Sequence, residues 1–74
     1  MSDTTSDLAA KVLTVSDGVF HGVRDDTGGR GLVEHLRTHG YTVVDHRVSE
    51  DGAEPVAAVL REMSAGFAGL LVTT

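Results

Sequence analysis

The pattern of apolar and polar positions along the chain predicts three strands separated by two helices. The run at residues 11–15 (KVLTV) is apolar and β-branched without clean alternation, which is typical of a strand covered on both faces. A second strand is predicted within residues 41–48, with TVV at residues 42–44 as its best part, and a third at residues 69–73.

Two amphipathic segments lie between these strands. Residues 27–39 are predicted to form a helix with Thr27 as its N-cap, and residues 54–64 to form another with Pro55 at its first position. Helical spacing places an apolar stripe on each. The stripes consist of Leu32, Val33 and Leu36 in the first helix, and of Val56, Val59, Leu60 and Met63 in the second.

The order β-α-β-α-β with short connections predicts an α/β fold, in which a parallel sheet formed by right-handed crossovers carries flanking helices. Residues 1–10 are expected to be a disordered tail before a domain at residues 11–74, and residues 16–26 a loop. Glycines at positions 28, 29 and 31 crowd the first turn of the first helix, where each costs roughly 1 kcal/mol relative to alanine. Close approach of a backbone or a ligand would explain them.

Polar pairs follow all three predicted strands: Ser16-Asp17, Glu50-Asp51 and Thr73-Thr74. In a parallel α/β sheet the ligand site lies beyond the carboxyl ends of the strands, so these pairs are expected at one rim. Ser16 and Asp17 can contact a ligand or a metal-bound phosphate, or form an ordinary turn. Asp51 can bind a ribose or a metal, or serve only as a turn residue.

Two further groups of side chains have competing interpretations. Asp25 and Asp26 can hold Mg²⁺, which takes few carboxylates together with phosphates, or can favour the positive end of the helix that follows. His35 and His39 have i, i+4 spacing at an exposed helix end, but no third metal ligand accompanies them.

Composition narrows the function classes. The chain has 74 residues, a hydrophobic fraction of 41%, a net charge of -5 and no cysteine. A disulfide framework and a thiolate metal site are therefore excluded, and no Lys/Arg cluster favours nucleic acid. No apolar run is long enough to span a membrane, and the polar, acidic start is unlike a signal peptide. We expect a cytoplasmic protein without membrane or nucleic-acid partners.

Residues 11–17 (KVLTVSD) and 21–28 (HGVRDDTG) together resemble the start of the MogA/MoaB family of molybdenum-cofactor biosynthesis proteins. The segment VSEDG at residues 48–52 is similar to the family's V-x-D segment, and GLLVTT at residues 69–74 to its L-V-L-T-T strand. Arg24 stands where an aromatic residue is common, and Gly29 replaces a frequent proline. The family's G-G-T-G motif would follow Thr74, so we expect residues 11–74 to be the N-terminal part of a three-layer α/β/α molybdopterin-binding domain.

The resemblance implies a molybdopterin adenylyltransferase-like protein that transfers AMP from Mg-ATP to molybdopterin. It implies that Asp51 is catalytic and helps to hold Mg²⁺ or the nucleotide, with Glu50 as the next candidate. Ser16 and Asp17 would line the pocket and Asp26 would support the loop, while Thr73 and Thr74 would lead into a phosphate-binding turn. Family members commonly form trimers, so a homotrimer is expected.

Two other interpretations stay open. One is a MoaB-like domain that binds the pterin without catalysis, which the residues after Thr74 would distinguish. The other is a receiver domain, which requires an acceptor aspartate at the end of the third strand, where Thr73 and Thr74 stand.

Overall fold

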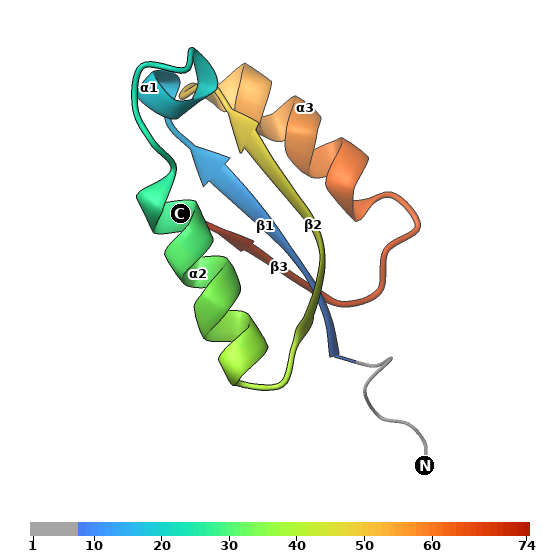
Figure 1. The fold of residues 1–74 in the computed structure, drawn as a ribbon. Coiled ribbons are helices and arrows are strands. Elements are labelled where there is room, and N and C mark those ends of the chain that lie inside the picture. Colours follow the sequence, from blue (N-terminus) through green and yellow to red (C-terminus); the bar gives the residue numbers. More distant parts are fainter. Residues whose placement is uncertain (1–7) are drawn as a thin grey trace.

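The computed structural model describes residues 8–74 and contains the predicted succession of strands and helices (Figure 1). The elements are β1 (Ala9–Val15), α1 (Asp17–Phe20), α2 (Thr27–Thr38), β2 (Thr42–Ser49), α3 (Ala53–Ser64) and β3 (Leu70–Thr73). The part of the predicted tail at residues 1–7 lies outside the described residues.

The strands form one parallel sheet in the order β2-β1-β3, as the β-α-β-α-β order predicts. The central strand is β1, which pairs with β2 on one side and with β3 on the other. Its residues Ala10, Val12 and Leu13 are fully buried, which agrees with a strand covered on both faces. The α/β fold class is therefore confirmed.

The two long helices cover opposite faces of the sheet, so the domain has three layers (Figure 1). Against one face, Val33 and Leu36 of α2 pack on Ala10 and Val12, and Leu32 adds a half-buried contact. Met63 of α3 is fully buried, whereas Val56, Val59 and Leu60 are half-buried. The predicted stripe of α2 is thus confirmed, and that of α3 is buried most deeply at its C-terminal end.

Several predicted boundaries differ from those in the structure. The segment at residues 16–26 is not only a loop, since the Ser16 side chain accepts a hydrogen bond from the Val19 N–H and caps the short helix α1. Asp26, not Thr27, is the N-cap of α2. β1 begins at Ala9, so residues 9 and 10 belong to the sheet and not to the tail. Pro55 is the third residue of α3, which starts at Ala53.

Lys11, a charged residue on the central strand, is accommodated at the end of α3. Its Nζ donates a hydrogen bond of 2.8 Å to the Met63 carbonyl and lies 4.4 Å from the centre of the Phe67 ring. The ammonium group therefore keeps polar and cation–π partners while its stem covers apolar surface.

Among residues 8–74, no helix has the length and apolar character needed to cross a membrane.

Candidate functional site

The carboxyl ends of the strands and the start of α2 meet at one rim of the sheet. The Ser16 N–H donates to the Ser49 carbonyl and the Thr74 N–H to the Leu13 carbonyl, each over 3.0 Å. These bonds continue the strand pairing past the end of β1 on both sides. The polar residues that follow the strands are thereby held at a common edge, where parallel α/β sheets place their ligands.

A hollow of about 350 Å³ opens at this rim, and we call it the rim pocket. Its lining residues come from the end of β1, from α1, from the segment before α2, from the start of α2 and from the residue after β3. They are Thr14, Val15, Ser16, Val19, Arg24, Asp25, Asp26, Thr27, Gly28 and Thr74. The structure therefore brings three of the predicted site residues together, namely Ser16, Asp26 and Thr74.

Residues that carry hydrogen-bond donors suited to an anion line the rim pocket. The first N–H groups of a helix have no partner within the helix, and Thr27 and Gly28, which begin α2, are among the lining residues. The Ser16 hydroxyl accepts from the Val19 N–H, so its own proton remains able to donate. A Cβ at Gly28 would meet nothing within 4 Å, so the backbone there is open to a ligand.

The acidic residues of the rim pocket accept hydrogen bonds from donors of the protein itself. Arg30 donates two hydrogen bonds, of 2.7 and 2.6 Å, to the carboxylate of Asp25, and these bonds lower the pKa of Asp25 below its ordinary value. Asp26 Oδ1 accepts from the Gly29 N–H over 2.9 Å, and Oδ2 accepts from the Thr14 hydroxyl over 2.9 Å. The carboxylates are thus occupied by protein donors.

Arg24 is a pocket residue that sequence reasoning did not select. Within residues 8–74 no ion pair involves its guanidinium, although the pocket is lined by its side chain. Its placement depends on backbone bonds, since the N–H groups of Val23 and Arg24 both donate to the Gly18 carbonyl. The signal that could have identified it is its departure from the aromatic residue common at this position of the family that the sequence resembles.

Asp17 and Asp51 lie outside the rim pocket but adjacent to one another. The Asp51 N–H donates to Asp17 Oδ1 over 2.9 Å, and both residues are exposed. Beside them, His21 Nε2 lies 3.3 Å from Glu50 Oε2. We call these four residues the acidic corner. In the described part of the chain no group of three or more His, Cys, Asp or Glu residues is arranged to hold a metal ion, so metal binding by Asp51 stays a prediction. Thr73 ends β3 and does not line the rim pocket.

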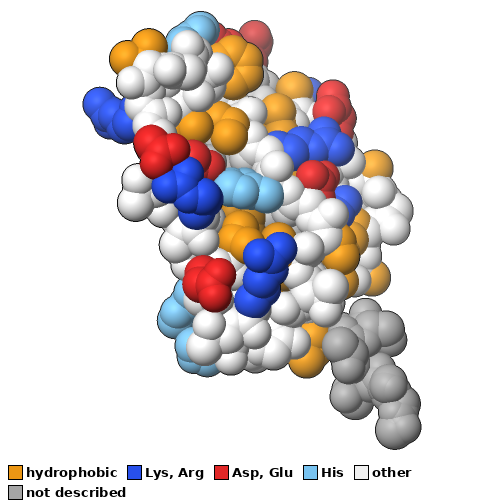
Figure 2. Space-filling model, viewed as in Figure 1, with side chains coloured by type: hydrophobic (Ala, Val, Ile, Leu, Met, Phe, Trp, Pro, Cys, Tyr) orange, Lys and Arg blue, Asp and Glu red, His pale blue; other side chains and the backbone are white. Residues whose placement is uncertain are grey.

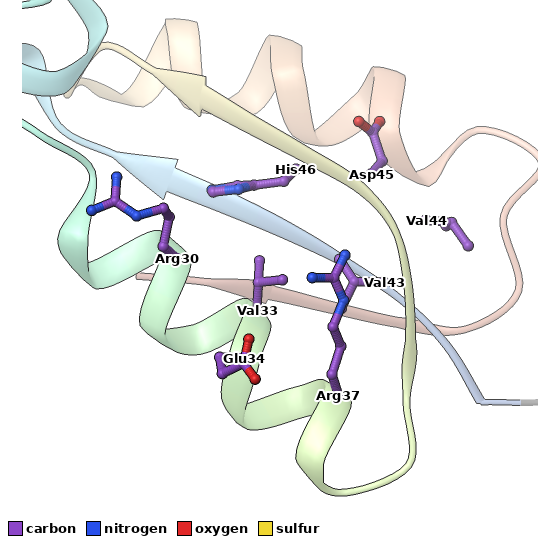
Figure 3. Close-up of a pocket in the computed structure, with 8 residues that line it drawn as sticks. All are labelled: Arg30, Val33, Glu34, Arg37, Val43, Val44, Asp45 and His46. Carbon is purple, nitrogen blue, oxygen red and sulfur yellow. The ribbon is translucent and has the colours of Figure 1, made fainter.

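A larger hollow of about 550 Å³ runs along α2 and the edge strand β2 (Figure 3). We call it the edge groove, and it is lined by Arg30, Val33, Glu34, Arg37, Val43, Val44, Asp45 and His46. It lies beside the sheet and not at the strand ends. Basic and acidic side chains are interleaved over this face of the molecule (Figure 2), so no charge of one sign dominates it. The smaller rim pocket is therefore the better candidate site.

Comparison with known proteins finds a family model and a solved structure that match this chain. A family model described as a probable molybdopterin binding domain matches residues 11–74. Among solved structures, the CinA protein of Thermoplasma acidophilum, a protein of unknown function, has a similar fold with a TM-score of 0.79 and 24% sequence identity. The similarity covers 89% of this chain and 38% of the CinA chain, so the present chain spans less than half of that protein. No curated protein matches this chain closely enough to count as a relative.

Proposed function

The chain belongs to the family of molybdopterin-binding domains, and on that premise we propose that the rim pocket binds molybdopterin through its terminal phosphate. The observation that carries the proposal is the combination of Arg24, the Ser16 hydroxyl and the start of α2 around one hollow. A phosphate is stabilised by the first N–H groups of a helix and by a guanidinium such as that of Arg24, which forms no ion pair within residues 8–74. The pairing of Asp25 with Arg30 reduces the repulsion that this pocket residue would exert on an anion.

We further propose that the domain serves AMP transfer to molybdopterin. In that reaction an oxygen of the molybdopterin phosphate bonds to the α-phosphorus of ATP, and the bond from that phosphorus to the β-phosphate oxygen breaks. Pyrophosphate leaves with the electron pair of the broken bond. Pocket donors that hold the molybdopterin phosphate would orient its attacking oxygen and stabilise charge on the transferring group.

We also propose that the acidic corner holds a magnesium ion that arrives with the nucleotide. Asp17 has one oxygen not bonded to the Asp51 N–H, and the carboxylate of Asp51 is exposed. Mg²⁺ is usually bound by one or two carboxylates together with substrate phosphates and water, so two adjacent acids suffice. When bound there, the ion would neutralise charge on the phosphates of ATP. We also propose, from the resemblance to the family, that the protein assembles as a homotrimer, which light scattering would measure.

Two arginine variants test the proposal. Arg24→Gln removes the guanidinium at the rim pocket, and Arg37→Gln makes the same change in the edge groove. We expect the first to weaken binding of molybdopterin, followed by anaerobic fluorescence titration, about three- to tenfold, the range for losing a charge-assisted hydrogen bond at an exposed site. The second should leave the dissociation constant unchanged. Equal effects of the two variants would place the ligand elsewhere.

A second measurement separates catalysis from binding alone. Single-turnover incubation of the protein with Mg-ATP and molybdopterin should yield adenylylated molybdopterin and pyrophosphate in equal amounts. Tight binding of molybdopterin without any AMP transfer would leave the non-catalytic pterin-binding domain as the function.

A further inference from the structure

One partly buried polar contact connects β2 to the start of α2 through His46. The His46 ring points from β2 toward the first turn of α2 (Figure 3). Its Nε2 lies 3.1 Å from Asp26 Oδ2 and 3.0 Å from Thr14 Oγ1. His46 lines the edge groove and is not part of the rim pocket, whereas Asp26 and Thr14 line the rim pocket. Any effect of His46 on a ligand there must therefore pass through these two residues.

The hydrogen bonds around Thr14 determine where the ring carries a proton. Thr14 is 3% exposed, and its hydroxyl has a single proton, which it donates to Asp26 Oδ2 over 2.9 Å. Both oxygens that approach His46 Nε2 then offer only lone pairs. A bare Nε2 would face two acceptors without a donor, so the contact requires the tautomer with hydrogen on Nε2.

These bonds hold the Asp26 carboxylate from three elements. Thr14 of β1 and His46 of β2 act on Oδ2, while the Gly29 N–H of α2 donates to Oδ1. Without His46, the Thr14 hydroxyl would be the one remaining donor to Oδ2, so rotation of the carboxylate about the bond that carries it would be less restrained. Because Oδ1 caps α2, such rotation would release the Gly29 N–H and move the first turn that faces the rim pocket.

We propose that His46 is a positioning residue for the rim pocket, which fixes the Asp26 carboxylate from outside the pocket and thereby sets the orientation of the first turn of α2. The proposal takes the proposed function as its premise, since the ligand is the molybdopterin phosphate. It extends that function to a strand residue that never touches the ligand. A histidine that only fills space would influence stability but would not need a donor at Nε2.

The test compares two replacements of His46 with a control. His46→Phe keeps a ring without a donor, and His46→Gln restores an N–H donor near the position of Nε2. His35→Gln changes an exposed histidine of α2 that does not line the rim pocket. Long-range ¹H–¹⁵N spectra report the ring tautomer of His46, the amide resonance of Gly29 reports the cap, and titration with molybdopterin reports the pocket. Thermal melting confirms that each variant is folded.

We expect wild-type His46 to carry hydrogen on Nε2. His46→Phe should shift the Gly29 amide and raise the molybdopterin dissociation constant about fivefold, the size of one lost hydrogen bond. His46→Gln should restore both readouts to near wild type, and His35→Gln should change neither. If His46→Phe is unfolded, the tautomer and the His46→Gln titration still decide the question.

Failure of the proposed function and failure of the positioning role of His46 would give different results. A wild-type protein that binds no molybdopterin would refute the proposed function, and the tautomer and Gly29 amide would then decide whether His46 positions Asp26. A wild-type protein that binds molybdopterin equally well with phenylalanine at position 46 would overturn the positioning role and leave the proposed function intact. A wild-type His46 without hydrogen on Nε2 would overturn the positioning role in either case.

Discussion

Gly29→Ala should destabilise the protein although alanine is the better helix former. Gly29 is buried in the first turn of α2, directly against the Thr14 hydroxyl and the Asp26 carboxylate. A Cβ at this position would overlap Thr14 Oγ1 and both carboxylate oxygens of Asp26. Thr14 is buried on the central strand, so relief of this overlap requires both its hydroxyl and the Asp26 carboxylate to shift, which breaks the bonds of Asp26 to Thr14 and Gly29.

The magnitude follows from three opposing contributions. Alanine in a helix interior gains about 1 kcal/mol over glycine. Loss of the Asp26 cap costs about 1 kcal/mol, and leaving the buried Thr14 hydroxyl without its acceptor costs about 2 kcal/mol. The net expectation is a loss of about 2 kcal/mol in the free energy of unfolding, or about 10 °C in melting temperature for a domain of this size.

Gly31→Ala is the matched control, because a Cβ there meets nothing within 4 Å and the residue is exposed. This change should raise stability by about 0.5–1 kcal/mol through helix propensity alone. Urea unfolding followed by circular dichroism measures both variants against wild type. If Gly29→Ala proves as stable as Gly31→Ala, the close packing of Thr14 and Asp26 around position 29 is not what requires glycine.

Further predictions concern the core, the acidic corner and the surface. Met63→Ala should cost about 2–5 kcal/mol because Met63 is fully buried, whereas Val23→Ala, at 84% exposure, should stay within about 0.5 kcal/mol; similar losses in urea unfolding would contradict this packing. Asp51→Asn should slow AMP transfer strongly with an unchanged melting curve, since the backbone N–H that binds Asp17 remains; transfer at the parental rate would make Asp51 a turn residue only. The pKa of Asp25 is lowered by Arg30, so its stabilising effect is present above the ordinary carboxyl pKa and is lost as pH falls through the lowered value. Wild type should therefore melt at a higher temperature than Asp25→Asn at neutral pH, and this difference should shrink in acid and in high salt. A difference that grows in acid would contradict a lowered pKa for Asp25.

The fold was predictable because its main signals are local. Runs of apolar β-branched residues and helical stripes identify the strands and long helices, and the β-α-β-α-β order requires a parallel sheet. The predictions that failed concern short segments whose structure depends on particular hydrogen bonds. α1 has 4 residues, too few for a periodic pattern, and depends on the Ser16 cap. Ala9 and Ala10 have weak strand propensity and join β1 because β2 pairs with both of them and β3 pairs with Ala10.

The candidate site was predictable in part. Ser16 and Thr74 meet because parallel strands end at the same edge, which their positions after apolar runs already indicate. Asp51 was expected at the same place, but its N–H bonds to Asp17 and holds it at the acidic corner. The direction of a turn after a strand depends on such a contact between distant residues, which no local pattern contains.

The contribution of His46 depends on an irregularity that alternation cannot reveal. In β2, Val43 pairs with Ala10 and faces α2, so simple alternation would direct Asp45 toward α2 and His46 away from it. The register shifts between Ala10 and Lys11, however, so that Val44 has no partner in β1 and His46 pairs with Val12. A one-residue shift transfers every later side chain to the opposite face. It thereby brings an imidazole donor, and not a second carboxylate, against the Asp26 carboxylate, where a like charge would repel the helix cap.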